Sequence, residues 1–408
     1  MLNRAVRTAL LMLAIGCFVG PALAGDADWP GWQGLNRDGR SRDTGLLKDW
    51  PAGGPKLAWK NESVGKGYSC PIVVDGTVYV TGDVGDKLAV FALDGEGKQK
   101  WTREVGSDAA DQWPGARSTP TYDSGKLYVL TAPGKLLCLD AAAEGKEVWS
   151  ADLVADFGGS PGRWCYAESP LIVGDKVIVA PGGKTAVVAL DKATGKKIWA
   201  TEGSGAKAAY GSCIVTTRPD SPMVVAPGAG GLTAVDTKTG AKLWANPFSA
   251  KGGMNCPTPV SVDDLVFWAV GYGKGGICLK LDDKGNATEA WTTTDLVCHH
   301  GGYIVNRGYV YGNNEKGWSC IELATGKTAW TAAGVGKGSI CYGDGMLYLF
   351  SEDGGKVGLA TCSPDKLEMK GTFSVAGAGK SWAHPVVTGG KLYLRYDTNL
   401  YCYDVKAK

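Results

Sequence analysis

The sequence predicts an all-β fold: an eight-bladed β-propeller of four-stranded antiparallel blades, with the ring closed by the N-terminal strand. A recurrent tryptophan, a turn phrase before it and a hairpin upstream of each phrase predict this fold. The aromatic residues recur about every 40 to 50 residues, at Trp59, Trp101, Trp149, Trp199, Trp244, Trp291, Trp330 and then Phe373. In a chain of short strands, this period is typical of a propeller.

The phrase before each tryptophan reads as a strand, a tight turn and a second strand. Residues 189–199 (ALDKATGKKIW) and 234–244 (AVDTKTGAKLW) are its clearest copies. Asp and Thr side chains bond nearby backbone groups and start such a turn, and Gly supplies the positive φ that closes it. We expect the aromatic residue after the turn to lie on the last strand of a blade and to pack against the neighbouring blade.

A second hairpin precedes each phrase, as at residues 73–80 (VVDGTVYV) and 171–179 (LIVGDKVIV). Apolar, β-branched runs around a short Gly or Asp turn predict a hairpin, so each period supplies four strands. The eight predicted hairpins end near Tyr79, Tyr128, Ile178, Val224, Phe267, Tyr311, Tyr348 and Tyr393.

The two ends of the chain predict how the ring closes. Only one strand, at residues 400–404, follows the last hairpin, and an orphan strand at residues 55–60 precedes the first. We expect the orphan strand to complete the last blade, because closure removes exposed strand edges. Seven blades would follow instead if the irregular sixth period is not a blade.

The N-terminus predicts an export signal over residues 1–24, built from Arg4, Arg7, an apolar stretch at residues 9–19 and a small-residue site at residues 22–24. That stretch is too short for a comfortable membrane span. A head segment at residues 25–54 and the propeller at residues 55–408 follow. We expect a monomeric, periplasmic protein without a membrane span; a lipoprotein anchored through Cys17 is the alternative.

Charge and cysteine usage narrow the range of partners. Without residues 1–24 the chain carries 41 basic and 41 acidic residues, which gives no electrostatic reason to expect a nucleic acid. The 12 cysteines include no Cys-x-x-Cys and no vicinal pair. This spacing favours buried thiols over a disulfide framework.

The loops that enter the first strand of each blade predict a ligand site at the channel mouth. All three histidines of the chain fall in these loops, together with several aromatic residues. The predicted ligand-binding residues are Tyr68, Trp113, Arg117, Trp164, Glu168, Tyr210, Asn255, His299, His300, Trp382 and His384. Such a set fits a small molecule or a peptide. The alternative is a set of polar loops around a wet channel plugged by aromatic rings.

The run Cys298-His299-His300 suggests a metal, which zinc or copper chemistry would allow. On a strand, residues 298 and 300 share a face and residue 299 points away, so at most two of the three would converge, with His384 as a third ligand. We expect no metal, because a lone local cluster is more often structural. We also expect Glu168 to form a salt bridge with Arg117 rather than an acid/base pair, and we identify no catalytic residue.

The phrase Ala-x-Asp-x-x-Thr-Gly-x-x-x-Trp at residues 189–199 and 234–244 resembles the tryptophan-docking repeat of the pyrroloquinoline-quinone (PQQ)-like propeller superfamily. This superfamily includes quinoprotein alcohol dehydrogenases and the non-enzymatic β-barrel assembly lipoprotein BamB. The resemblance implies the propeller fold over most of the chain. The head, residues 29–39 with 53–59, is similar to the head of many bacterial PQQ-repeat proteins.

The resemblance also implies what a quinone enzyme would need. The dehydrogenases hold the quinone between a tryptophan and a ring made by vicinal cysteines, and hold Ca²⁺ with carboxylate and amide oxygens. This sequence has no vicinal cysteine pair, and Glu168 and Asn255 do not match the calcium ligands. We therefore expect no cofactor and a BamB-like binding propeller with a protein, peptide or glycan partner in the cell envelope. The alternatives are a PQQ-dependent dehydrogenase and a metal-dependent enzyme at His299, His300 and His384.

Overall fold

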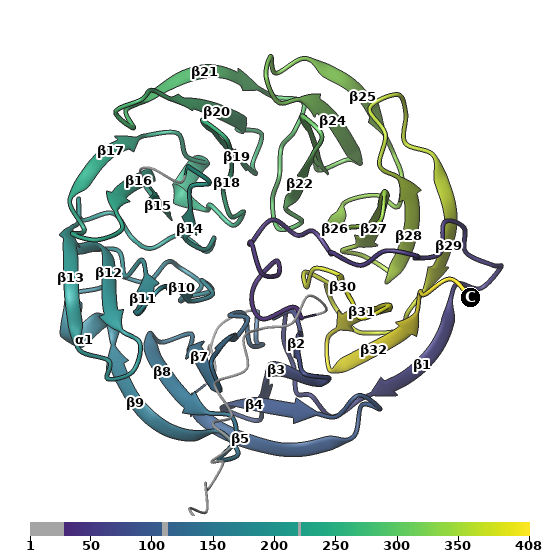
Figure 1. The fold of residues 1–408 in the computed structure, drawn as a ribbon, viewed down its shortest axis with the longest axis horizontal. Coiled ribbons are helices and arrows are strands. Elements are labelled where there is room, and N and C mark those ends of the chain that lie inside the picture. The colour runs from purple at the N-terminus through teal and green to yellow at the C-terminus, as the bar shows by residue number, and fades with distance from the viewer. Residues whose placement is uncertain (1–27, 108–112, 219–221) are drawn as a thin grey trace, which may run out of the picture.

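The computed structural model describes residues 28–107, 113–218 and 222–408. These residues form eight four-stranded antiparallel sheets that stand as blades around a central channel (Figure 1). The prediction of an eight-bladed all-β propeller is confirmed, and the seven-blade alternative is wrong because the sixth period is a complete blade. The predicted export signal, its cleavage site and Cys17 lie outside the described residues.

Seven of the blades run from an inner to an outer strand in chain order, and in the eighth the outer strand is the N-terminal β1. The first two blades are β2 (Ile72–Val74), β3 (Thr77–Val84), β4 (Lys87–Leu93), β5 (Gln99–Ser107); and β6 (Thr121–Asp123), β7 (Lys126–Leu130), β8 (Lys135–Asp140), β9 (Lys146–Asp152). The third and fourth are β10 (Leu171–Val173), β11 (Lys176–Val179), β12 (Thr185–Asp191), β13 (Lys197–Glu202); and β14 (Ile214–Val215), β15 (Met223–Gly228), β16 (Gly231–Asp236), β17 (Lys242–Asn246).

The fifth and sixth blades are β18 (Val260–Val262), β19 (Leu265–Val270), β20 (Gly275–Leu281), β21 (Ala287–Thr293); and β22 (Tyr303–Asn306), β23 (Tyr309–Asn313), β24 (Trp318–Glu322), β25 (Thr328–Ala332). The seventh is β26 (Gly338–Gly343), β27 (Met346–Ser351), β28 (Lys356–Thr361), β29 (Met369–Ser374). The eighth is β30 (Val386–Thr388), β31 (Lys391–Tyr396), β32 (Asn399–Asp404) and β1 (Lys56–Asn61). Two short helical turns, α1 (Leu153–Phe157) and η1 (Lys251–Gly253), lie in loops.

The turn phrase forms the bend between the two outer strands of a blade. In the third blade, Asp191 Oδ1 accepts hydrogen bonds from the backbone nitrogen and the hydroxyl of Thr194, at 2.8 and 2.6 Å. Gly195 follows with a φ of 74°, which a residue with a side chain rarely adopts. Ala189 then pairs with Trp199, and the register shifts directly after this pair. The phrase therefore sets both the turn and the position of the tryptophan.

The recurrent tryptophans join neighbouring blades, as the sequence predicted. Trp149 Nε1 donates to the carbonyl oxygen of Lys192 in the next blade at 3.0 Å. Its ring lies against Gly195, where an added Cβ would approach Trp149 Cδ2 to 2.7 Å. The same contact joins Trp59 to Gly97, Trp101 to Gly145, Trp199 to Gly240 and Trp291 to Gly326. The glycine of the phrase is thus required by the turn and by the tryptophan of the preceding blade.

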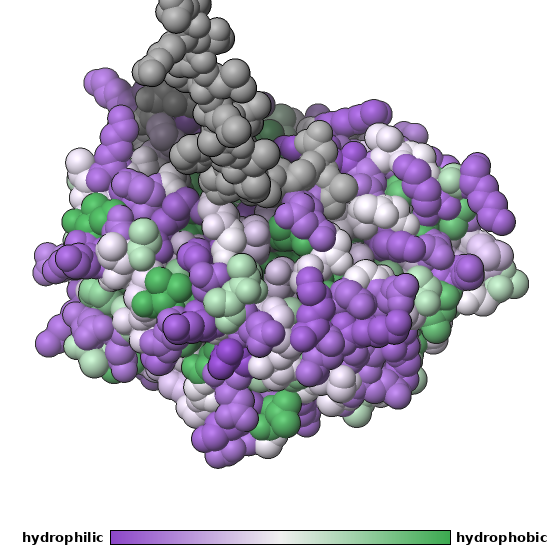
Figure 2. All heavy atoms as spheres, turned by 60° about the horizontal axis from the view of Figure 1, so that its bottom comes forward, coloured by the Kyte–Doolittle hydropathy of each residue, from purple (hydrophilic) through white to green (hydrophobic). Residues whose placement is uncertain are grey.

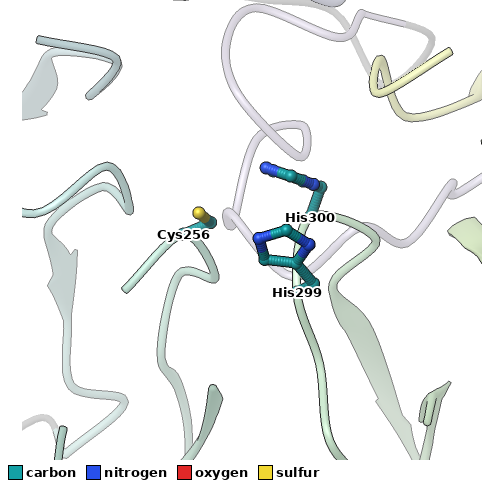
Figure 3. A group of neighbouring side chains, drawn as sticks. All are labelled: Cys256, His299 and His300. Carbon is teal, nitrogen blue, oxygen red and sulfur yellow. The ribbon is translucent and has the colours of Figure 1, made fainter. Parts of the chain in front are cut away.

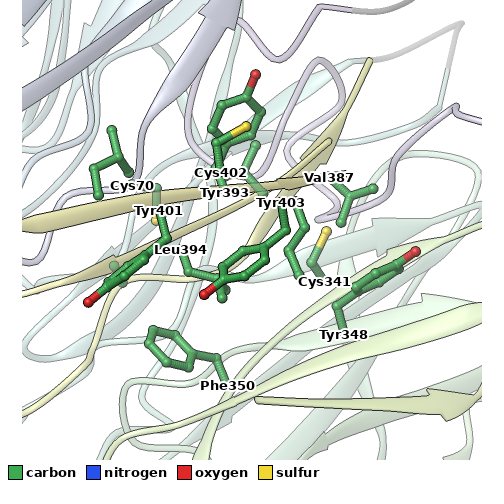
Figure 4. Close-up of a cluster of buried hydrophobic side chains, with 14 of the residues drawn as sticks. Cys70, Cys341, Tyr348, Phe350, Val387, Tyr393, Leu394, Tyr401, Cys402 and Tyr403 are labelled. Carbon is green, nitrogen blue, oxygen red and sulfur yellow. The ribbon is translucent and has the colours of Figure 1, made fainter. Parts of the chain in front are cut away.

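The N-terminal strand closes the ring, which confirms the predicted closure. Strand β1 pairs antiparallel with β32, from Lys56 opposite Asp404 to Asn61 opposite Leu400 (Figure 1). A large buried cluster covers this joint and includes side chains of the first, seventh and eighth blades and of the head. Figure 4 shows Tyr393, Tyr401 and Tyr403 among its members.

The chain before β1 runs across the channel before it reaches the outside of the ring (Figure 1). The described part of the predicted head segment is residues 28–54. Its backbone forms a β-bridge to the first blade, between Trp29 of the head and Val73. It also bonds to the eighth blade, where the nitrogen of Leu47 donates to the carbonyl oxygen of Val405. The head segment is therefore built into the propeller rather than appended to it.

The outer surface offers no large apolar face in the view of Figure 2, which is mostly hydrophilic with hydrophobic residues scattered singly. Single exposed apolar residues are ordinary on the surface of a folded protein. Of the eleven cysteines in the described part of the chain, eight are buried and Cys165, Cys256 and Cys362 are half-buried. Across the described ranges, no helix has the length and apolar character that a membrane crossing requires.

Candidate ligand cavity in the channel

One end of the channel holds a cavity of about 340 Å³. We call it the aromatic cavity, because seven aromatic rings line it: Trp32, Tyr68, Trp113, Trp164, Tyr210, Tyr272 and Trp382. The other lining residues are Arg117, Ala167, Ser169, Ser212, Cys256, His299 and His300. Eight of the residues that the sequence predicted as ligand-binding lie in this lining.

A chain of hydroxyl groups fixes the loops that carry these rings. The backbone nitrogen of Cys70 donates to Thr119 Oγ1 at 2.9 Å, and that of Thr119 donates to Ser169 Oγ at 3.0 Å. In the same way, the backbone nitrogen of Ser169 donates to Ser212 Oγ at 3.0 Å, and that of Ser212 donates to Thr258 Oγ1 at 3.1 Å. The entry loops of the first five blades are therefore tied to one another in order, which holds this part of the cavity wall in a fixed position.

Trp382 is the centre of one wall. Its ring lies 5.0 Å from Trp113 and 4.8 Å from Tyr68 between centroids. It stacks on His300 at 4.2 Å with an angle of 28° between the ring planes. Across the cavity Trp164 lies 6.0 Å from Tyr210. These flat apolar surfaces suit a planar or aromatic group.

Trp32 of the head segment supplies part of the lining, which the sequence did not predict. Its Nε1 donates to Thr258 Oγ1 at 2.9 Å, and its ring lies 4.7 Å from that of His384. Neighbouring head residues, among them Arg37, line a separate cavity of about 790 Å³. The head segment therefore lies between the two cavities.

His299 and His300 both lie in the aromatic cavity, so the prediction that residue 299 points away is wrong. Residues 298–300 form a bend before β22 instead of a strand, and a bend does not impose alternation. The two rings lie 3.7 Å apart. His299 contacts the Tyr272 hydroxyl at 2.9 Å and Lys337 Nζ at 3.1 Å. The Cys298 thiol is buried and donates to the carbonyl oxygen of Gly302.

The histidines are neutral at pH 7 because burial penalises their charged forms. Burial, with the nearby Lys337 ammonium, lowers the pKa of His299 to about 4. Burial lowers the pKa of His300 well below its usual value and that of His384 to about 4. Burial also raises the pKa of the Cys256 thiol to about 12. The cavity therefore presents neutral donors and acceptors, with Arg117 at its wall.

Three predicted residues, Glu168, Asn255 and His384, lie outside the cavity lining. Glu168 is buried and accepts hydrogen bonds from the backbone nitrogens of Ala180 at 2.8 Å and Cys213 at 3.2 Å. Burial raises the pKa of its carboxyl group, and the cation acting on it is Arg37. The expected salt bridge with Arg117 is therefore wrong, because the carboxylate is turned into the wall beneath the loops.

The side chains of Asn255 and His384 form hydrogen bonds with backbone atoms. Asn255 Oδ1 accepts from the nitrogen of Ala250 at 2.9 Å, and its Nδ2 donates to the carbonyl oxygen of Gly228 at 2.8 Å. His384 Nε2 lies 2.9 Å from the carbonyl oxygen of His300. His384 thus contacts His300 through its backbone and is not part of the group of potential ligand atoms that the two neighbouring histidines form with Cys256.

Sequence reasoning missed Trp32 and Tyr272. Tyr272 lies between β19 and β20, outside the entry loops, and Trp32 lies in the head segment. A repeated Ser or Thr in the entry loops was the available sign that these loops form one ring. Nothing in the repeat shows that the head crosses the channel.

A family model described as outer membrane protein assembly factor BamB matches residues 107–332 of the chain. Among individual proteins, the chain is similar to quinohemoprotein alcohol dehydrogenase ADH-IIG of Pseudomonas putida, 31% identical over 193 residues, which is 43% of this chain and 26% of that protein. It is similar to a dehydrogenase subunit of alcohol dehydrogenase (quinone) from Gluconacetobacter polyoxogenes, 30% identical over 197 residues, 44% of this chain and 26% of that protein. The matched region thus spans about a quarter of these relatives.

Two solved structures share the fold. BamB from Moraxella catarrhalis superposes with a TM-score of 0.59 and 20% identity, covering 79% of this chain and 95% of that one. Quinohemoprotein alcohol dehydrogenase from Comamonas testosteroni gives a TM-score of 0.66 and 16% identity, covering 94% of this chain and 81% of that one. At these identities the likeness concerns the fold alone.

The relatives correct the expectation that no cofactor is bound. Their names are those of quinone enzymes, so missing local motifs are no ground for excluding a quinone. The cavity lining comes from the loops of several blades and from the head, so it leaves no contiguous sequence motif. The rings of Trp32 and Trp382 and the guanidinium of Arg117 fit a planar acidic ring system. The described lining has no carboxylate, the ligand type that calcium prefers, so it fits a quinone better than a calcium ion.

Proposed function

This chain belongs to the family described as outer membrane protein assembly factor BamB, and we propose on that premise that it is a binding propeller of the cell envelope. Its partner is a protein or peptide that presents an aromatic side chain to the aromatic cavity. The observation that carries this proposal is the set of seven aromatic rings around one cavity.

The size of the cavity determines what enters it. At about 340 Å³ it lies at the small end of ligand pockets, which suits one or two side chains and not a folded domain. The rest of the partner would then lie on the rim. Large flat side chains buried at the centre of an interface contribute most of its binding energy. Trp382, with its three ring neighbours, has the position of such a centre.

The test is site-specific photocrosslinking in the native envelope. The crosslinker replaces Trp113, which is 36% exposed on the cavity, or Leu243, which is 42% exposed on the outer strand β17 as the matched control. We expect a crosslinked partner from position 113 only, and a weaker product when Trp382→Ala is added. Equal products from both positions, or no effect of the second change, would contradict the proposal.

A second function, oxidation of an alcohol with a bound quinone, is favoured by the similarity to the two alcohol dehydrogenases. Its test is titration of the mature protein with pyrroloquinoline quinone, followed by quenching of tryptophan fluorescence and by alcohol-dependent reduction of a dye. Quenching that Trp382→Ala abolishes, together with dye reduction, supports the enzyme. Quenching without dye reduction supports a cavity that only binds planar ligands.

A further inference from the structure

We propose that Cys256, His299 and His300 form a binding site for a zinc or copper ion on the wall of the aromatic cavity. One sulfur and two imidazole nitrogens, each on a half-buried residue, all lie within 4.8 Å of one another. Figure 3 shows Cys256 on one loop and His299 and His300 on a separate loop beside it. The proposal does not depend on the partner proposed above.

The donor set selects the class of metal. Thiolate and imidazole are ligands of zinc and copper, whereas calcium and magnesium take oxygen ligands. Ligand atoms around one zinc ion lie about 3.5 Å apart, so the side chains close by about 1 Å on binding. Three protein ligands leave one position open, and here that position faces the aromatic cavity, which all three residues line. An exchangeable ligand, such as water or a side chain of a partner, completes the coordination.

Buried polar side chains pin the two loops that carry the ligands. Cys256 follows Asn255, whose amide group is bonded on both sides to the backbone of Ala250 and Gly228. His300 is held by His384, whose Nε2 lies 2.9 Å from its carbonyl oxygen. Asn255 and His384 are therefore positioning residues for the site, which accounts for two buried polar groups that do not reach the cavity lining.

His299 and His300 each have a ring nitrogen whose lone pair could bind a metal. Among the described residues, His300 Nδ1 is buried without a hydrogen-bond partner. The stacking of His300 on Trp382 fixes the plane of its ring. His299 Nε2 is bonded to the hydroxyl of Tyr272, a residue exposed enough for water to replace that bond. Binding at this nitrogen exchanges the hydroxyl for the metal.

The positive charge of Lys337 lies beside His299 and should weaken the binding of a metal cation. Its ammonium lies 3.1 Å from His299 Nδ1 and 3.4 Å from the Glu352 carboxylate. It donates to Nδ1 and so keeps the imidazole proton on Nε2. A metal on Nε2 requires that proton to move to Nδ1, and Lys337 then shifts to Glu352. The Cys256 thiol also releases its proton to solvent when the metal binds.

The experiment is metal titration of the reduced, metal-free mature protein without a partner. Co²⁺ serves as the spectroscopic probe, with Zn²⁺ in competition, Cu⁺ under anaerobic conditions against a chelator, and Ca²⁺ as the negative control. We expect one equivalent to bind, with a sulfur-to-cobalt charge-transfer band. Cys256→Ser should remove that band and weaken binding by about tenfold or more.

The controls decide between this site and other thiols of the chain. Cys165→Ser, a half-buried cysteine outside the cluster, should bind like the wild type, and Lys337→Ala should bind more tightly. His300→Asn is a second ligand variant, and near-ultraviolet circular dichroism verifies folding. Equal affinity of the two cysteine variants, or no binding by folded wild type, overturns the proposal. Either result leaves the crosslinking test of the partner unaffected, so the two failures are distinguishable.

Discussion

Arg37 of the head segment donates from Nη1 to the carbonyl oxygen of Cys213, just before β14, at 2.8 Å. Its Nη2 donates to the carbonyl oxygens of Ser169 at 3.1 Å and of Pro170. The guanidinium is buried, and burial lowers its pKa to about 10. One side chain thus joins the head to the third and fourth blades from inside the channel.

Replacing Arg37 should loosen this joint. In Arg37→Met, three carbonyl oxygens each lose one hydrogen bond, and within the described part of the chain only that of Pro170 keeps another, from the Thr121 hydroxyl. Glu168 also loses the nearby cation, so we expect the free energy of unfolding to fall by about 3 kcal/mol. Denaturant titration measures the change. The matched control is Arg40→Met, whose exposed guanidinium bonds Asn306 and whose loss should cost less than about 1 kcal/mol. Equal losses would show that the head is not anchored at Arg37.

Gly195→Ala tests the contact between tryptophan and turn. The new methyl group would meet the Trp149 ring at 2.7 Å, and the φ of 74° is unfavourable for alanine. We expect a loss of about 3 kcal/mol, which combines overpacking with backbone strain. Gly174→Ala is the control, because its φ is 59° and no atom lies within 4 Å of the added methyl. It should lose only about 1 kcal/mol; similar losses would refute a specific role of the ring.

The buried carboxyl of Glu168 predicts a pH dependence of stability. Its pKa is raised in the folded protein, so the folded state holds this proton more tightly than the unfolded state. The stability that the neutral form contributes is complete below the unfolded pKa and is lost as pH rises through the folded pKa. The unfolding free energy of the wild type relative to Glu168→Gln should fall as the pH rises above about 4, the ordinary pKa of a glutamate. Parallel curves would contradict this sign.

Trp59→Ala tests closure of the ring. Trp59 Nε1 donates to the carbonyl oxygen of Gly95 at 2.9 Å, and its ring packs on Gly97 and on Tyr393. We expect the thermal midpoint to drop, with a loss of about 3 kcal/mol typical of a large aromatic truncation. Leu57→Ala in the same strand is the control, since that side chain is 46% exposed and should cost less than about 1 kcal/mol.

The repeat made the fold predictable. The Asp, Thr and Gly of the phrase each perform one local task, at Asp191, Thr194 and Gly195, so the sequence shows the turn directly. The closure of the ring could be predicted by counting strands, because the last blade lacked one strand and one strand before the first blade had no partner.

The site was less predictable, because its parts come from places that the repeat does not relate. The entry loops led to most of the cavity wall, but Trp32 comes from the head and Tyr272 from a hairpin turn. The direction of His299 was wrong because a bend, not a strand, carries it. Glu168 is buried, which excludes it from the cavity lining. The sequence of a loop does not show whether a charged side chain in it is buried or exposed.

The pairing of β1 with β32 has a consequence for how the molecule is made. Seven blades consist of contiguous sequence and can form as soon as their last strand is synthesised. The eighth blade cannot form in this way, because β1 with Lys56 has no partner until β32 with Asp404 has been synthesised. The first strand of the propeller is thus the last to find its partner, and its edge stays unpaired until β32 has been synthesised. A chain without residues 399–404 would lose the strand through which the first and last parts of the propeller pair.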